Sequence, residues 1–156
     1  MPRLVLLVAL NLLVVRPGAG AVQQLTATEI SAGGLAVMAR HSFTGGELGF
    51  ARRSVDTRVA FAVAGGDEAG SAAARAQLTI QMLVNSAART GVGIYAGLGG
   101  ACSVRRDTAG KAWLAVLLGL EARPGRGNGW YLELGLSGGV RAAAGWRLRS
   151  FPPWWR

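Results

Sequence analysis

The chain has 156 residues, of which 51% are hydrophobic and 16% charged; it contains 24 glycines and has a net charge of +9 and a mean hydropathy of +0.31. This length suits one domain, and the glycine content argues against ordinary helices, because each interior glycine costs a helix about 1 kcal/mol relative to alanine. The positive charge does not indicate nucleic-acid binding, since Lys111 is the only lysine and no basic helix or tail accompanies it.

The N-terminal segment predicts export. Arg3 precedes an apolar run over residues 4–15, and four small residues, 18–21, follow it. This order is typical of a secretory signal peptide, and a run of twelve residues is shorter than the roughly 20 that a spanning helix needs. We assign residues 1–21 to the signal peptide, with cleavage after its last alanine, and the polar residues 22–32 to a short leader.

The rest of the chain alternates with a period of two, as strands do. In the clearest segment, Leu78, Ile80 and Met82 alternate with Gln77, Thr79 and Gln81. Separated by Gly-, Asn- and Pro-containing turns, strands are predicted at residues 35–40, 47–51, 58–64, 77–85, 92–99, 113–121, 129–136 and 140–149. The longest predicted loop is 65–74. This pattern predicts an all-β, eight-stranded antiparallel up-and-down barrel over residues 33–151, followed by a Pro- and Trp-rich tail at 152–156.

The two faces of the predicted strands differ in a way that indicates which one lies inside. One face is aliphatic, and the other combines many glycines and alanines with a few full charges. A soluble barrel would cover its outer face with polar residues, whereas the narrow lumen of an eight-stranded membrane barrel needs small residues between a few large polar ones. The aliphatic face is therefore predicted to meet lipid, with interface aromatics at Trp130, Trp146, Phe151, Trp154 and Trp155.

With its signal peptide, strand count, alternation and terminal aromatic strand, residues 145–151, the chain resembles the small bacterial outer-membrane β-barrels. This family contains the transmembrane domain of outer-membrane protein A and outer-membrane protein X, and the resemblance covers roughly residues 33–151. It implies location in the outer membrane, with the lipid bilayer and the outer-membrane assembly machinery as partners. That machinery reads an aromatic residue at the end of the last strand, whereas this chain continues beyond Phe151 with Pro-Pro-Trp-Trp-Arg.

The small-and-polar face places charged residues in the lumen. The predicted turns set Glu121 across from Tyr131, with Arg147 one strand further on, and set Glu133 one level higher with Arg141 placed diagonally. Buried charges need such partners, so we expect a charged plug. Also predicted in or near the lumen are Arg40, Glu47, Arg58, Gln77, Thr79, Gln81, Tyr95 and Arg149.

Catalysis and metal or cofactor binding are not expected. His41, the only histidine, neighbours Ser42, but adjacent strand residues point to opposite faces and cannot form a nucleophile–base pair without a bulge. One histidine and one cysteine, Cys102, give no metal-ligand spacing.

The predicted function is that of an outer-membrane barrel with a structural or surface-associated role and a mostly closed lumen. A narrow channel for small ions or solutes is one alternative; the arginine excess would favour anions, and the plug would have to rearrange. A soluble lipocalin-like barrel that binds an apolar ligand is another, in which the aliphatic face would point inward.

Overall fold

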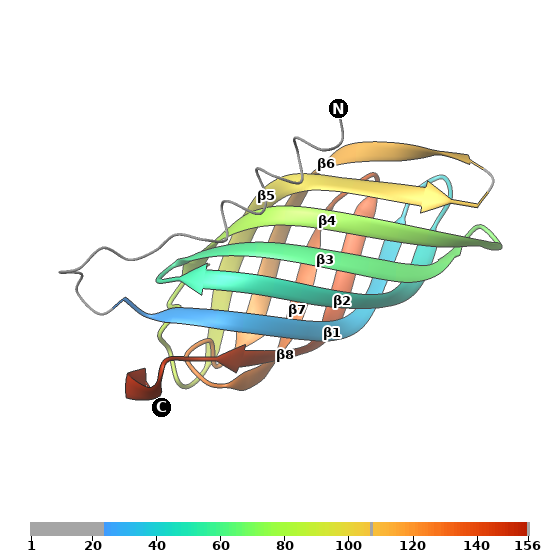
Figure 1. Cartoon of the computed structure of the whole chain (residues 1–156). Helices are drawn as coiled ribbons and strands as arrows, with labels where there is room; N and C mark the ends of the chain where they lie inside the picture. The colour runs from blue at the N-terminus through green and yellow to red at the C-terminus, as the bar shows by residue number, and fades with distance from the viewer. Residues whose placement is uncertain (1–23, 107, 156) are drawn as a thin grey trace.

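The computed structural model describes residues 24–106 and 108–155 as a closed barrel (Figure 1). Each strand pairs antiparallel with its neighbours in sequence, and β1 pairs with β8. The strands are β1 (Thr26–Met38), β2 (Phe43–Ser54), β3 (Thr57–Glu68), β4 (Ser71–Val84), β5 (Val92–Arg105), β6 (Thr108–Ala122), β7 (Asn128–Leu136) and β8 (Val140–Ser150), followed by the 3-10 helix η1 (Pro153–Trp155). The predicted eight-stranded antiparallel barrel is confirmed. The predicted signal peptide, residues 1–21, lies outside the described residues.

The barrel has two distinct ends. At the terminal end, β1 begins, β8 and η1 end the chain, and three turns join β2 to β3, β4 to β5 and β6 to β7 (Figure 1, left). The far end carries the four remaining connections, after β1, β3, β5 and β7. No helix in residues 24–106 or 108–155 is both long and apolar enough to cross a membrane.

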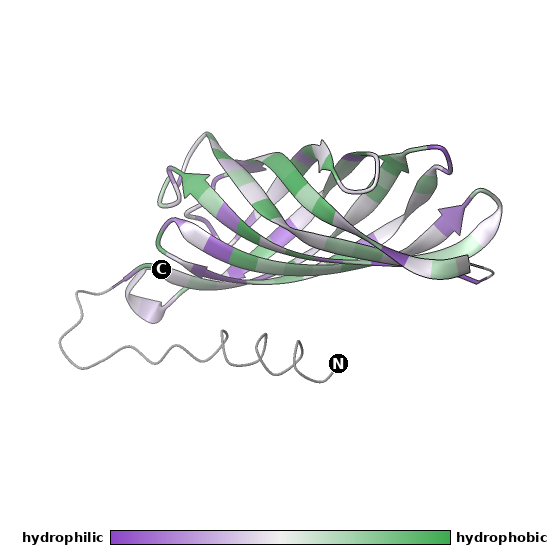
Figure 2. Ribbon diagram, turned by 90° about the horizontal axis from the view of Figure 1, so that it is seen from above, coloured by the Kyte–Doolittle hydropathy of each residue, from purple (hydrophilic) through white to green (hydrophobic). Residues whose placement is uncertain are grey.

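Side chains alternate between the interior and the outer surface along each strand. In β7, Trp130, Leu132 and Leu134 are exposed while Tyr131 and Glu133 are buried. In Figure 2, green segments of the strands are accordingly interrupted by pale and purple ones. Large apolar side chains that lie exposed on the outer surface include Ile30, Leu48, Phe50, Phe61, Ile80, Met82, Ile94, Leu98, Leu114, Leu118, Trp146 and Leu148. The hydrophobic effect in water gives no reason for this arrangement.

Interior glycines make room for the few large side chains in the lumen. A Cβ atom at Gly119 would overlap the ring of Tyr95, which lies beside it on β5. A Cβ atom at Gly33 would come within 2.7 Å of the Tyr131 hydroxyl. The absence of a side chain at these two glycines therefore leaves room for Tyr95 and Tyr131 in the lumen.

Two sequence-based boundaries were wrong. The predicted leader, residues 22–32, contains the start of β1. This strand pairs with β2 from Thr26 and with β8 from Thr28. The outward positions there include Thr28, Ala32 and Gly34, so the aliphatic half of the alternation is weak. In the predicted loop 65–74, β3 and β4 instead continue to a two-residue turn.

The turn between β3 and β4 consists of Ala69 and Gly70, with φ angles of +54° and +80°. Two successive left-handed residues match the twist of an antiparallel hairpin. The backbone N–H of Gly70 also donates to Asp67 Oδ1 at 2.9 Å. A tight turn thus replaces the only loop predicted to be long.

Candidate functional site: the charged lumen

Three layers of side chains fill the lumen. The terminal layer consists of Glu29, Arg53, Arg58, Glu121, Arg147 and Arg149, all buried. The middle layer consists of Glu47, Tyr95, Tyr131, Glu133 and Arg141, also buried. The far layer is Arg75, buried beside Phe43, Trp113 and Ser137.

Arg58 is the centre of the terminal layer. Its Nε lies 2.8 Å from Glu29 Oε2 and its Nη2 lies 2.7 Å from Glu121 Oε2. Its remaining Nη1 donates to Gln81 Oε1 at 3.0 Å. Glu121 also forms an ion pair with Arg147. Strands on opposite sides of the barrel are thus joined through the lumen by charge-assisted hydrogen bonds, the stronger class of such bonds.

Arg141 holds the middle layer together. Its Nη1 lies 2.6 Å from Glu133 Oε2, and its Nη2 lies 2.8 Å from Glu47 Oε2. The hydroxyl of Tyr95 donates to Glu133 Oε1 at 2.7 Å. Arg147 connects this layer to the terminal layer, because its Nη2 is 3.5 Å from Glu133 Oε1 and its Cζ lies 4.8 Å from the Tyr131 ring centroid.

Arg75 closes the far end of the lumen. Its Cζ lies 5.0 Å from the Trp113 ring centroid and 5.6 Å from that of Phe43, both within cation–π range. Its Nη2 donates to the backbone oxygen of Ser137, in the turn between β7 and β8, at 2.5 Å. The guanidinium therefore bridges the far rim between aromatic rings.

Little space remains between the layers. A cavity of about 30 Å³ separates the terminal and middle layers, and one of about 10 Å³ separates the middle and far layers. A buried water molecule needs roughly 10 to 15 Å³ of such accessible space. The larger cavity therefore has room for about two water molecules. Side chains thus fill the lumen, and neither cavity can hold an organic ligand.

The lumen contains more positive than negative charge. Its buried ionisable residues include six arginines and four glutamates, an excess of two positive charges if all are ionised. The terminal layer alone has four of these arginines and two of the glutamates. Arg53 Nε and Nη2, and Arg149 Nε and Nη2, have no hydrogen-bond acceptor. Hydrogen-bond donors therefore outnumber acceptors among the side chains at this end of the lumen.

Solved structures that align with this chain include small bacterial outer-membrane proteins. The N-terminal β-barrel domain of Pseudomonas aeruginosa OprF aligns with a TM-score of 0.60 and 16% identity, over 82% of this chain and 100% of that one. Yersinia pestis Ail, crystallised with the heparin analogue sucrose octasulfate, aligns with a TM-score of 0.54 and 14% identity, over 83% and 100%. Neisserial surface protein A aligns with a TM-score of 0.50 and 13% identity, over 79% and 96%.

The chain has the outer-membrane β-barrel fold. At these identities, the likeness concerns the fold and not the activity. Neither a protein-family model nor a curated protein matches the sequence.

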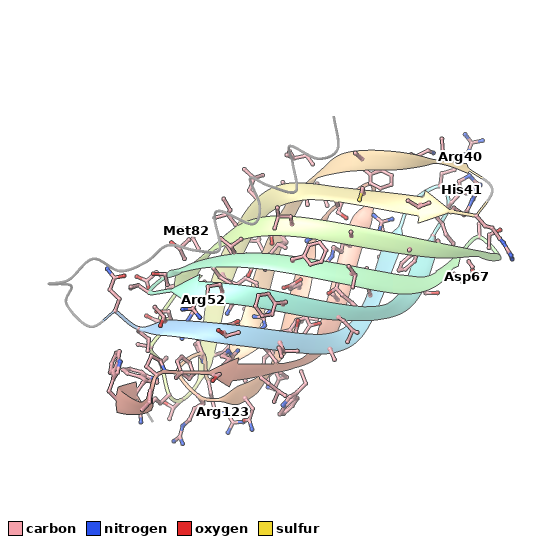
Figure 3. All side chains as sticks on the ribbon, viewed as in Figure 1. Arg40, His41, Arg52, Asp67, Met82 and Arg123 are labelled. Carbon is pink, nitrogen blue, oxygen red and sulfur yellow. The ribbon has the colours of Figure 1, made fainter. Side chains whose placement is uncertain are left out.

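In this outer-membrane-type barrel, the five residues predicted to form a lumen network lie close together. Glu121 pairs with Tyr131 in the β6–β7 register, and Arg147 reaches both Glu121 and Glu133. Arg141 lies diagonally to Glu133 and forms an ion pair with it. Arg40, also predicted in or near the lumen, is instead exposed on the turn between β1 and β2 (Figure 3).

Three charged residues of the lumen were missed. Glu29 falls within the predicted leader and Arg75 lies next to the predicted loop, so neither was assigned to a strand. Arg53 lies two residues beyond the predicted end of its strand. Continuing the inward series Glu47, Gly49, Ala51 by one more step would have found it.

The predicted interface aromatics separate into two groups. Trp130 and Trp146 are paired across β7 and β8 on the outer surface, and Trp154 is also exposed. Phe151 is 8% exposed and packs against Leu25 and Ala27, so it lies inside the end of the barrel and not at the membrane interface as predicted. Because Ser150 takes the outward position at the end of β8, the next side chain points inward.

Trp155 is half-buried at the terminal end. Its ring centroid lies 6.3 Å from that of Phe151, and its indole N–H donates to the backbone oxygen of Gly125 at 3.0 Å. The tail therefore folds back onto the turn between β6 and β7.

The residues weighed for catalysis and metal binding lie apart from the lumen. His41 and Ser42 are exposed on the turn after β1 (His41 in Figure 3), and Cys102 is exposed on the outer face of β5. In the part of the chain that the structure describes, no three His, Cys, Asp or Glu side chains are grouped so that they could hold a metal ion.

Proposed function

We propose that this protein spans the bacterial outer membrane as a sealed barrel with a structural or surface-associated role. One observation carries the proposal: a closed sheet presents its apolar side chains outward while its charges are paired inside. Lipid solvates such an outer face, and closure gives every strand a hydrogen-bonding neighbour, which a bilayer requires because it offers no water to backbone groups.

The length of the strands supports a membrane span. The nine residues of β7, at about 3.4 Å each and a tilt of about 40°, extend about 23 Å along the barrel axis, close to the roughly 25 Å apolar band of outer-membrane barrels. Trp130 and Trp146 then lie toward one edge of the band, where tryptophan is favoured.

We assign the terminal end to the periplasmic side. Because the number of strands is even, β1 begins and β8 finishes at the same end of the barrel. A chain exported by a signal peptide inserts into the outer membrane from the periplasm. The far end then faces outward, with tight turns such as Ala69–Gly70. Contacts with the cell's surroundings would use strand ends and turns, since long loops are absent from the described part of this end.

The predicted alternative of a soluble barrel with an apolar ligand does not fit the structure. The interior contains ion pairs, and its cavities measure about 30 and 10 Å³. The channel alternative requires ion pairs such as Arg58–Glu121 to separate, because this pair joins β3 to β6 through the lumen. A sealed lumen predicts no conductance above that of the bare bilayer when the purified protein is reconstituted in a planar membrane. Steady single-channel currents would favour the channel instead.

The proposal is tested by membrane fractionation together with gel migration in SDS before and after boiling. A sealed membrane barrel is expected in the outer-membrane fraction, with a mobility that changes on heating as the barrel unfolds. Recovery in the soluble periplasmic fraction would refute the proposal.

A further inference from the structure

A basic hollow lies at the terminal end of the barrel, outside the layers that seal the lumen. It measures about 370 Å³ and lies between the β4–β5 turn, the β6–β7 turn and the end of β8. Its charged side chains are Arg89, Arg126 and Arg149, and Phe151 and Trp155 are its aromatic walls. No carboxylate lines it among the described residues.

Contacts among three segments hold the hollow in shape. Arg89 donates to the backbone oxygen of Trp155, and its Cζ lies 4.7 Å from the centroid of that indole ring. Arg126 Nε donates to the backbone oxygen of Arg89 at 3.3 Å. The indole N–H of Trp155 is bound to Gly125 O at 3.0 Å. In Figure 1, η1 accordingly lies beside the β6–β7 turn.

Arg149 lines the hollow from the lumen side. Its side chain is fully buried, and its Nη1 donates to the backbone oxygen of Arg126 at 3.4 Å. Its Nη2 forms an ion pair with Glu121 Oε2 at 3.1 Å, and its Nε lies 3.9 Å from Glu29 Oε1. Glu121 already pairs with Arg58 and Arg147. The terminal layer still contains four arginines against two glutamates, so its positive charge is only partly compensated by the carboxylates present.

We propose that this hollow is a binding site for a phosphate-type oxyanion. Arg149 would hold the anion from the lumen side, and Arg89 and Arg126 from the two turns, with the Trp155 ring as a wall. Each guanidinium has five N–H donors in a planar fork that matches the oxygens of phosphate. Arg89 and Arg126 each use one of these donors in the contacts above, so most remain available.

Two sources could supply this chemistry: free phosphate, or the phosphate of an anionic phospholipid headgroup at the inner leaflet. Binding of the oxyanion itself does not depend on the proposed membrane location. The lipid source does, because it requires the terminal end to lie at the periplasmic surface of the membrane.

The test is calorimetric titration of inorganic phosphate into the full chain, folded in a non-ionic sugar detergent. We expect saturable binding that the double substitution Arg89→Gln and Arg126→Gln weakens at least tenfold. Both side chains are exposed, and the heat-dependent gel shift verifies that the variant is folded. The matched control, Arg40→Gln with Arg106→Gln, removes two exposed arginines at the far end and should leave the affinity unchanged. Absence of saturable binding, or equal weakening by both pairs, would overturn the site.

The source is identified in phosphatidylcholine vesicles with or without phosphatidylglycerol. A headgroup ligand predicts that phosphatidylglycerol raises the melting temperature of the wild type more than that of the Arg89/Arg126 variant and displaces inorganic phosphate. A free-phosphate ligand predicts that vesicle composition changes neither measurement. If phosphate binds in detergent but the chain does not insert into vesicles, the site stands and the proposed membrane function fails.

Discussion

Leu134 and Glu133 are neighbours in β7, yet their side chains need opposite surroundings. Leu134 is 55% exposed on the outer surface, whereas Glu133 is 5% exposed in the lumen and bound to both Arg141 and Tyr95. One residue of register separates lipid from a network of charges. Single substitutions at these two positions therefore test the two faces separately.

Leu134→Arg places a charge near the middle of the apolar surface. We expect the free energy of unfolding to fall by about 2 to 4 kcal/mol, because an arginine facing lipid at the midplane loses its hydration. Asn128→Arg is the matched control: it faces outward at the terminal end of the same strand, where the expected cost is about 0 to 1 kcal/mol. Urea unfolding in phospholipid vesicles measures both, and equal costs would argue against a lipid-facing β7.

Glu133→Ala removes one partner of a buried ion pair. We expect a loss of about 3 to 5 kcal/mol, since Arg141 keeps its buried charge with only Glu47 left as a close carboxylate. Adding Arg141→Met should restore part of this loss, because the uncompensated charge disappears. The same unfolding assay applied to a double-mutant cycle gives the coupling energy. Additive losses would mean that the pair contributes no net coupling.

Strands were predictable where both faces of the alternation are informative. The segment from Gln77 to Val84 combines large aliphatic residues outside with polar residues inside, and its place within β4 matches the prediction. In β1 and at the far ends of β3 and β4, outward positions such as Gly34, Gly65 and Ala74 are small. With small residues outside, large apolar side chains no longer alternate with polar ones. The period-two pattern that identifies a strand is therefore weak in these segments.

Glycine positions within β5 and β6 provide a test at the scale of the element. Gly119→Ala should lower the unfolding free energy by about 1 to 3 kcal/mol through overpacking, because the Tyr95 ring that a Cβ would meet is buried and bound to Glu133. Gly100→Ala is the control: it faces outward from β5 and a Cβ there meets nothing within 4 Å. Thermal unfolding in vesicles compares them, and a neutral Gly119→Ala would mean that the tyrosine can move aside.

At the scale of the molecule, the alternation in sequence predicted a closed eight-stranded barrel with charges inside. It did not predict how the ends are closed. Arg75 of β4 contacts Phe43 of β2 and Trp113 of β6, and Phe151 after β8 packs against Leu25 before β1. Their contacts depend on the inward or outward position of a single residue at a strand end, which local pattern does not determine.

The central claim is that the apolar outer face of the barrel contacts lipid. The accessibility of spin labels on this face tests it most directly. Labels at Leu118→Cys and Leu134→Cys, each in a Cys102→Ser chain to remove the exposed native cysteine, would be measured in vesicles with oxygen and with a water-soluble nickel chelate. A label at Arg106→Cys on the far turn is the aqueous control. We predict that oxygen reaches both outer-face labels while the chelate reaches only the control. Chelate access at positions 118 and 134 would place this face in water and contradict a membrane-spanning barrel.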